Sequence, residues 1–365
     1  MQKNNVTQVY WKSLPELLNP DGKKVQDLKG FDDEFIDIVD YIIRITHRIW
    51  EQKNVGLCLD YYGEYCPVHT LGGYSDDVDT VVKNTLKTIA AFPDRSLIGE
   101  NVVWRELGEK AGYYSSHRIT SIMTNTGPSE FGAATGKTGR VTTIADCICL
   151  ENKIVYEWLM RDNSFLVKQL GLDPLDAAAH FASLPIPAEF TSWYQSEYSR
   201  VIAGEETEHQ WPTSIDPDYL AFAQNWINTL FNQKAFSQVS DFYHKNASIQ
   251  WPGGVEACGI PGIRGVLIQS LGLCPDAKVT CDHVAVVPFD DDQTDIAIRW
   301  SLAGTFQSGN EKLAKYTGQN HFVLAATHLR IKDNKIVNEW TVYDEIAMYA
   351  NLIRDFNTKQ ERQAK

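Results

Sequence analysis

The hydrophobic pattern divides the chain twice into a helical half followed by a strand-rich half. Apolar positions recur at helical spacing from Asp32 to about Gln52 and again over Val78–Phe92, and this order returns in Tyr219–Phe231 and Gly262–Gly272. After each helical half come segments rich in Val, Ile, Thr, Tyr and Trp, which are typical of strands. We therefore expect strands at Ser96–Leu107, Gly112–Asn125, Val141–Leu150 and Ile154–Arg161, and at Lys278–Val287, Asp295–Phe306, Asn320–Ile331 and Ile336–Tyr343.

A direct repeat accounts for this doubled pattern. The segment Lys153–Asp162 returns as Lys335–Asp344, 182 positions later (335 − 153), with Lys-Ile-Val, Glu-Trp and the final Asp retained. Further upstream, Gly72-Gly73 matches Gly253-Gly254 at an offset one residue shorter. A period of this length is far longer than a solenoid unit, so each copy should fold as a domain with its own core.

Helices followed by an antiparallel meander predict an α+β domain in which the helices cover one face of a curved antiparallel sheet. Two such domains fit the usual size range for this length. The expected organisation is an N-terminal arm packed on the first domain (1–30), a first domain (31–172), a helical connector (173–215), a second domain (216–357) and a short tail (358–365).

Composition excludes several partners. The formal net charge of −13 argues against nucleic acid and anionic membrane surfaces, which require a basic face. No apolar stretch reaches 18 residues and the first residues lack a signal-peptide core, so we expect no membrane span and no secretion. The seven cysteines are odd in number and predict a reduced, cytoplasmic protein. Cys147-x-Cys149 lacks a second pair, so no metal site is expected.

The repeated aspartates are the first candidate catalytic residues. Because alternate strand residues share a face, Asp344 should point with Trp340, and Asp162 with Trp158. A carboxylate on the concave side of a sheet would be desolvated, which raises its pKa and prepares it for general acid–base work. An alternative is that both aspartates are N-caps, because each precedes a segment with a helical pattern.

His328 and its repeat partner Asp146 are the second pair of candidates, and their placement depends on a turn. A two-residue turn at Asp333-Asn334 would send His328 to the face opposite Trp340. A three-residue turn that also includes Lys332, with Asn334 left-handed, would place it on the same face. We favour the longer turn, which groups His328 with Trp340 and Asp344, and Asp146 with Trp158 and Asp162. A satisfied interior histidine is the alternative.

Four repeated aromatic residues are candidates for contact with a substrate. Trp158 and Trp340 follow the repeated glutamate, and either forms a substrate platform or belongs to the core. Tyr62 and Tyr243 occupy matching positions, where packing with the hydroxyl at a rim is the alternative to substrate binding.

These motifs resemble the SnoaL-like polyketide cyclase family, within the nuclear transport factor 2-like superfamily. That family typically shows Thr-Gly-Lys, a strand, a turn ending in Lys-Ile-Val, Glu-Trp, an Asp four residues after the Trp, and Gln-Leu-Gly. The first copy has Thr135-Gly136-Lys137, Lys153-Ile154-Val155, Glu157-Trp158, Asp162 and Gln169-Leu170-Gly171; the second has Thr317-Gly318, Lys335-Ile336-Val337, Glu339-Trp340 and Asp344.

The resemblance implies two tandem cone-shaped α+β barrels of cystatin-like type, each with an apolar cavity. It also implies a dimer packed through sheet faces, here an intramolecular pseudo-dimer that leaves a further homodimer open. The implied activity is cofactor-free acid–base chemistry on a small hydrophobic carbonyl or polyketide-like substrate by a cyclase, isomerase, lyase or hydrolase. Asp162 and Asp344 take the acid/base role and His328 that of the cavity histidine, with Asp146 in its place in copy one. The family's Gly-Thr-His stretch is absent, so a non-catalytic binder of an apolar ligand and a scaffold with plugged cones are alternatives.

Overall fold

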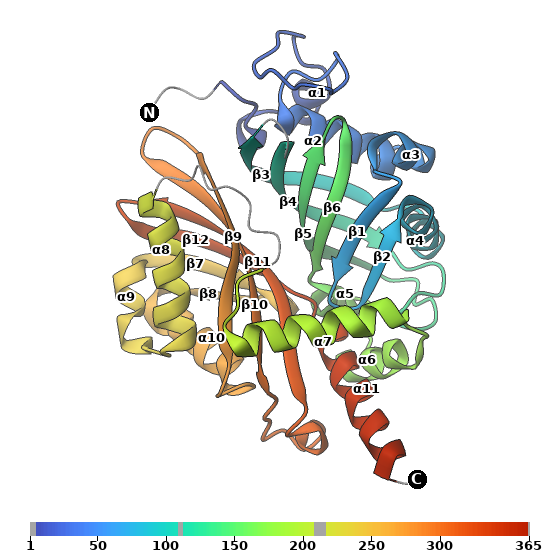
Figure 1. Ribbon diagram of the computed structural model, residues 1–365, viewed down its shortest axis with the longest axis vertical. Helices are drawn as coiled ribbons and strands as arrows, with labels where there is room; N and C mark the ends of the chain where they lie inside the picture. The colour runs from blue at the N-terminus through green and yellow to red at the C-terminus, as the bar shows by residue number, and fades with distance from the viewer. Residues whose placement is uncertain (1–4, 109–111, 208–216, 364–365) are drawn as a thin grey trace.

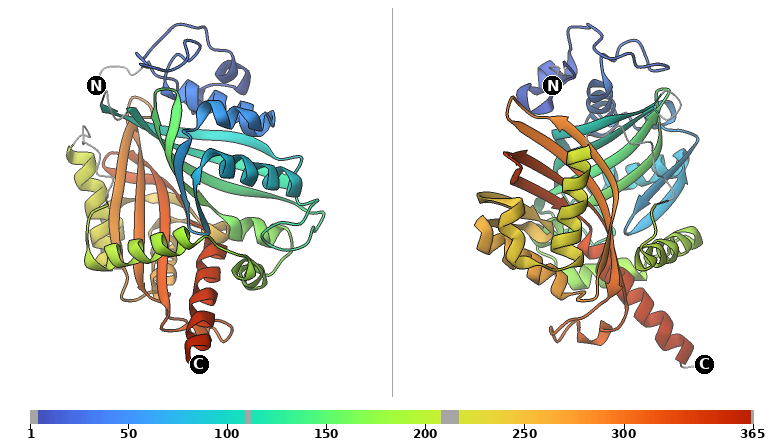
Figure 2. Two further views of the ribbon diagram at one scale, coloured as in Figure 1. Left: turned by 45° about the vertical axis from the view of Figure 1, so that its right-hand side comes forward. Right: turned by 60° about the vertical axis from the view of Figure 1, so that its left-hand side comes forward.

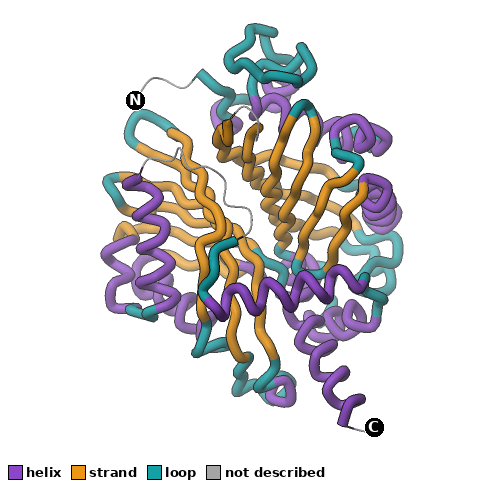
Figure 3. Tube along the Cα trace, viewed as in Figure 1, coloured by secondary structure: helices purple, strands orange, loops and turns teal. Residues whose placement is uncertain are grey.

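The computed structural model describes residues 5–108, 112–207 and 217–363, so the expected end of the connector and residue 216 lie outside the described part. Each copy of the repeat builds one six-stranded sheet, and its helices cover the sheet face that is turned away from the other copy (Figures 1 and 3). We call the segment from α2 to α5 unit one and the segment from α8 to α11 unit two. The expected α+β class and the paired cones are confirmed.

Unit one follows the expected order of helices and strands. Its long first helix begins at the cap Asp37, whose carboxylate accepts the Asp40 amide (2.8 Å). Asp77 caps the later helix in the same way through Thr80 (2.7 Å). The elements are α2 (Ile38–Thr46), η2 (His47–Glu51), η3 (Val55–Leu57), α3 (Cys58–Tyr61), β1 (Tyr65–Thr70), β2 (Gly73–Asp77), α4 (Val78–Ala91), β3 (Ser96–Gly108), β4 (Gly112–Thr124), β5 (Thr138–Leu150), β6 (Lys153–Arg161) and α5 (Asn163–Gln169).

Unit two repeats this order, and its last helix runs through most of the expected tail. The elements are α8 (Pro217–Ile227), η4 (Asn228–Asn232), η5 (Phe236–Gln238), α9 (Val239–Phe242), β7 (Tyr243–Trp251), η6 (Pro252–Gly254), β8 (Val255–Cys258), α10 (Gly259–Gly272), β9 (Lys278–Pro288), β10 (Gln293–Thr305), η7 (Ala314–Tyr316), β11 (Asn320–Lys332), β12 (Lys335–Val342) and α11 (Glu345–Gln363). The connector between the units contains two helices, α6 (Pro174–Ser183) and α7 (Ala188–Ala203).

The sheets are mixed, and the expectation of purely antiparallel sheets is wrong at one pair in each. β1 runs parallel to β6, with Val68 opposite Glu157, and β7 runs parallel to β12, with Ile249 opposite Glu339. The hairpins β1–β2 and β7–β8 were not expected, because their short strands are interrupted by Gly, Pro and polar residues that weaken a strand pattern. They complete the concave wall of each cone.

The repeated Gly-Gly pairs permit close approach between the units. A Cβ atom on Gly254, which has a φ of +72°, would lie 2.3 Å from the Phe165 ring on α5 of unit one. A Cβ atom on Gly72 would lie 2.7 Å from the Phe181 ring and 3.3 Å from the Ala347 Cβ atom. The β-hairpin of each unit therefore packs against the helix that ends the other unit.

The two sheets face each other (Figures 1 and 2), and side chains make reciprocal contacts between them. The Arg118 guanidinium of unit one lies 3.7 Å from the ring centre of Trp340 in unit two. Arg299 occupies the matching position in unit two and lies 3.6 Å from the ring centre of Trp158 in unit one. Contacts that exchange partners in this way define an isologous interface, so the chain folds as an intramolecular pseudo-dimer.

The N-terminal arm contacts unit one and also reaches unit two. Its short elements are η1 (Val9–Trp11) and α1 (Leu14–Leu18). The Thr7 amide donates to Asp37 of unit one (2.8 Å), but the Trp11 indole N–H donates to the Phe289 carbonyl of unit two (3.3 Å). The arm therefore bridges the units. Among the described residues, no helix combines the length and apolarity needed to cross a bilayer.

Candidate functional site

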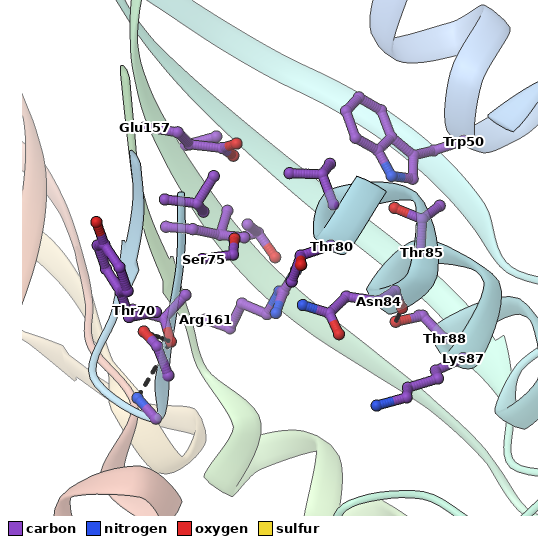
Figure 4. Close-up of a pocket in the computed structure, with 18 of the residues that line it drawn as sticks. Trp50, Thr70, Ser75, Thr80, Asn84, Thr85, Lys87, Thr88, Glu157 and Arg161 are labelled. Carbon is purple, nitrogen blue, oxygen red and sulfur yellow. Dashed lines mark hydrogen bonds between the residues drawn. The ribbon is translucent and has the colours of Figure 1, made fainter. Parts of the chain in front are cut away.

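The cone of unit one encloses a cavity of about 800 Å³, within the range of small-molecule sites. Its floor is the concave face of the sheet, and its walls include α2 and α4 (Figure 4). Three cross-strand rows of side chains from β4, β5 and β6 make up most of the floor. They are Ser115, Cys147 and Glu157; His117, Ala145 and Leu159; and Ile119, Thr143 and Arg161.

The cone of unit two is filled by its own aromatic side chains. The strand registers align Thr70 with Trp251 and Ile119 with Trp300, and both tryptophans are buried. Phe231 packs between them, with ring centres 6.3 Å from Trp251 and 5.3 Å from Trp300. The plugged cone considered for the scaffold alternative therefore occurs in one unit, and the open site lies in the other.

Glu157 and Glu339, the repeated glutamates, show what this difference does to a buried carboxylate. Glu339 accepts hydrogen bonds from the Tyr243 hydroxyl (2.5 Å), the Trp251 indole (2.6 Å) and the Thr341 hydroxyl (2.7 Å). Among the described residues, Glu157 accepts one such bond, from the Tyr62 hydroxyl (3.1 Å), because Leu159 replaces one of the other donors and the Thr70 hydroxyl donates to the Gly73 carbonyl instead. Glu157 therefore keeps acceptor capacity free for a group in the cavity.

Burial also changes the protonation of Glu157. Loss of solvation raises the pKa of its carboxyl group, and the Tyr62 hydrogen bond and the Arg161 charge oppose that increase. A carboxylate with a raised pKa and few donors is a stronger base than one in water, which is the property required for proton abstraction.

Neutral polar groups lie beside Glu157 on the same floor. Burial lowers the pKa of His117 to about 3, so its imidazole is neutral near pH 7. Within the described part of the chain, the His117 Nε2 and Ser115 Oγ atoms are buried without hydrogen-bond partners. Such atoms carry a desolvation cost that a polar ligand group would relieve.

Asp162 and Asp344 both cap helices, as the alternative interpretation held. Asp162 accepts the Phe165 amide (3.1 Å) and the Gly253 amide of unit two (2.8 Å). Asp344 accepts the Ala347 amide (3.0 Å). Asp344 also lines the cavity of unit one, which it reaches across the interface, whereas the described lining does not include Asp162.

The environment of Asp344 makes it titrate near neutrality. Burial raises the pKa of its carboxyl group to about 7. Hydrogen bonds from the Ala347 amide and from the Asn163 side chain (2.5 Å) oppose that increase. The pKa of Asp344 is therefore higher in the folded than in the unfolded protein. The stability that the protonated Asp344 contributes is complete below the unfolded-state pKa and is lost as pH rises toward 7.

We expect Asp344→Asn to gain stability relative to the unmodified protein as pH rises from 5 to 8. The amide cannot ionise, so it avoids the cost of a buried charge, and the difference should grow by about 2 kcal/mol over that interval. Urea unfolding at both pH values measures it. A difference independent of pH would show that Asp344 titrates normally.

The expected placement of His328, Asp146, Trp158 and Trp340 inside the hollow is wrong. His328 lies directly opposite Trp340 and shares its face, but that face meets the other unit. The His328 Nε2 atom is 2.8 Å from the Ser116 hydroxyl of unit one. Asp146 pairs with Arg299 of unit two (3.3 Å), and the two tryptophans stack on arginines of the opposite unit.

The turn that precedes β12 explains this outcome. It is a two-residue turn with Asp333 and Asn334 left-handed (φ 50° and 58°), not the favoured three-residue turn. A bulge then inserts Val337, which restores the shared face of His328 and Trp340. The relative facing of these two residues is therefore as expected, although the turn is different.

The two repeated tyrosines, Tyr62 and Tyr243, differ in the same way as the two cones. Tyr62 lines the cavity and donates to Glu157, whereas Tyr243 is buried in the filled cone and donates to Glu339. Glu157 was not among the site residues predicted from the sequence. The repeat nevertheless carried a signal. Glu157 matches Glu339, but the residues that correspond to Trp251 and Thr341 beside Glu339 are Thr70 and Leu159.

Comparison with known proteins supports the fold of the second unit by sequence. Residues 221–352 match the family model described as SnoaL-like polyketide cyclase, so the carboxyl-terminal part carries a domain of this type. No curated protein matches the chain.

Solved structures of similar proteins each cover about one third of the chain. A SnoaL-like polyketide cyclase from Agrobacterium tumefaciens is 22% identical, covering 37% of this chain and 94% of its own, with a TM-score of 0.28. TsrD from Streptomyces laurentii is 15% identical over 36% and 92%, with a TM-score of 0.32. A protein with a ketosteroid isomerase-like fold from Catenulispora acidiphila is 14% identical over 39% and 98%, with a TM-score of 0.31.

Proposed function

We propose that this chain is a cofactor-independent enzyme of the SnoaL-like type that acts on a small, largely apolar carbonyl compound in the cavity of unit one. The observation that carries the proposal is the contrast between Glu157 and Glu339. Glu339 accepts three hydrogen bonds inside a filled cone, whereas Glu157 faces a cavity of about 800 Å³ and has one donor among the described residues. Unit two serves as the structural partner that completes the site with Asp344.

The chemistry follows from the groups on the cavity floor. Glu157 removes a proton from the carbon next to the carbonyl, and the electron pair of the broken C–H bond moves to the carbonyl oxygen. Neutral donors such as the His117 imidazole or the Ser115 hydroxyl stabilise the resulting enolate. Return of the proton to another carbon gives isomerisation, and attack of the enolate carbon on a second carbonyl gives cyclisation. Asp344, with its pKa of about 7, is a second group able to exchange protons.

The Thr70→Trp variant tests this assignment. In unit two, Trp251 at the matching position donates its indole N–H to the glutamate (2.6 Å), so the same residue should cap Glu157 and occupy part of the cavity. We expect α-proton exchange of the bicyclic ketone 2-tetralone in D₂O, followed by proton NMR, to fall roughly 100-fold or more.

Leu86→Trp is the matched control, because it adds the same indole at an exposed position of α4. Thermal unfolding of both variants establishes that they fold. Exchange that survives in a folded Thr70→Trp protein would place the reaction outside this cavity. Retention of the ketone by the unmodified protein without any exchange would identify a binding protein instead.

A further inference from the structure

We infer that the substrate carries an anionic group, such as a carboxylate, which Arg161 and Arg95 bind at the end of the cavity away from Glu157. This inference rests on the proposed function only in placing the substrate in the cavity of unit one. Both arginines line that cavity, and Figure 4 shows Arg161 projecting from β6 toward α4.

Arg161 is a half-buried cation that makes no direct ion pair among the described residues, although its charge opposes the burial-driven rise in the pKa of Glu157 and of Asp344. Within the described ranges, its guanidinium makes no hydrogen bond or ion pair, although it lies in the cavity wall. Arg95 donates only to the Ser121 hydroxyl, through Nε (3.3 Å) and Nη2 (3.2 Å). Burying an unpaired charge costs free energy, and an anion bound between these two groups would reduce that cost through charge-assisted hydrogen bonds.

A buried hydroxyl supplies a third, independent indication. Thr143 lies opposite Arg161 in the β5–β6 register and lines the cavity. Its side chain is 3% exposed, and its Oγ1 atom has no hydrogen-bond partner among the described residues. An anionic oxygen beside Arg161 would accept a hydrogen bond from this hydroxyl group.

Nearby carboxylates act on the arginines through their charge, but in the described structure none of them forms an ion pair with Arg161 or Arg95. Glu130 lines the cavity but is exposed, and it forms no ion pair with Arg161 in the described structure. Asp344 is engaged by Asn163 and by its own helix, and its pKa of about 7 leaves it partly protonated at neutral pH. Burial, followed by the charge of Arg161, lowers the pKa of Arg95 to about 10, and the charge of Glu51 opposes that shift. Two guanidinium groups therefore lie near each other at this end of the cavity.

The filled unit lacks this arrangement. The residue that corresponds to Arg161 is Tyr343, and the residue that corresponds to Arg95 is Ala277, two places after the repeated Pro93 and Pro275. In a chain with a formal net charge of −13, the arginine pair occurs where the cavity occurs. The pair is therefore tied to the ligand site rather than to the fold.

The separation of the two ends defines the substrate class. Glu157 and Arg161 lie four residues apart on β6, which places their Cα atoms roughly 13 Å apart. A compact aromatic or alicyclic acid spans that distance, with its anionic group at the arginines and its reactive carbonyl near Glu157. Leu159, between them on the same face, contacts the apolar skeleton.

Two fluorescent probes that differ by one anionic group test this inference. The anion 8-anilinonaphthalene-1-sulfonate and the neutral N-phenyl-1-naphthylamine share an apolar skeleton. We expect the unmodified protein to bind the sulfonate more tightly, and Arg161→Gln to weaken sulfonate binding roughly tenfold or more while changing the neutral probe less than about threefold. Arg95→Ala should act in the same direction. Arg140→Gln, at an exposed arginine outside the cavity lining, is the control.

Equal affinities of the two probes for the unmodified protein, or equal weakening of both by Arg161→Gln, would overturn the inference. Probe selectivity does not depend on proton transfer. A preference for the sulfonate that persists in a protein without ketone exchange would therefore contradict the proposed catalysis and leave the anion site standing.

Discussion

Replacing Glu157 by glutamine should lower the rate of ketone α-proton exchange by about 10²–10⁴-fold, which is the usual contribution of a positioned general base. The side chain keeps its size and can still accept the Tyr62 hydrogen bond, so the fold should persist. What disappears is the basic oxygen that faces the cavity.

The repeat provides a matched control for this experiment. Glu339→Gln changes the same residue at the same position of the other unit, where three donors occupy the carboxylate inside a cone filled by aromatic side chains. We expect this variant to lose stability rather than activity, because the amide nitrogen cannot accept the bonds that an oxygen accepted. Comparable loss of exchange in both variants would indicate a general disturbance of the fold.

The pH profile gives a second readout for Glu157. Burial raises the pKa of this carboxyl group, so exchange should increase with pH through a midpoint above the usual range for glutamate and then level off. Glu157→Gln should abolish that step. A step that remains unchanged in the variant would assign the base to another group, and Asp344 would be the first alternative, because it lines the same cavity.

Much of the fold was predictable because it follows from local periodicity. The eight long strands read as runs of β-branched and aromatic residues, and the repeat fixed their grouping into two similar domains. The short hairpins were not predicted because segments such as Gly73–Asp77 carry little β propensity. Gly73–Asp77 pairs with β1, and β1 is held in the sheet by the distant strand β6. Parallel pairing of β1 with β6 is likewise a tertiary property without a local signal.

The candidate site was less predictable for a geometric reason. Alternation along a strand indicates which residues share a face, but it does not indicate which face lies inside the cone. His328 and Trp340 do share a face, yet the other unit covers that face. Glu157, one residue before Trp158, necessarily points the opposite way, into the cavity. Only the packing of the two sheets decides between these faces.

Removing the charge of Arg299 should produce the largest loss of stability at the interface. Its guanidinium stacks on Trp158 and pairs with Asp146 (3.3 Å), and the two paired side chains are 2% and 1% exposed. Arg299→Met would leave Asp146 buried with the hydroxyl groups of Tyr114 (2.5 Å) and Ser116 as neutral donors. An unpaired buried charge of this kind costs about 3–5 kcal/mol, which urea unfolding would measure.

The pseudo-symmetry again offers the control, because Arg118 makes the matching stack on Trp340 but pairs with Glu100, whose side chain is 31% exposed. Water can solvate Glu100 when Arg118 is lost, so Arg118→Met should cost less than Arg299→Met. Adding Asp146→Asn to Arg299→Met removes the stranded charge and should recover most of the loss. Equal losses at the two arginines, with no recovery in the double variant, would mean that packing on the tryptophans holds the units together and that the buried ion pair contributes little.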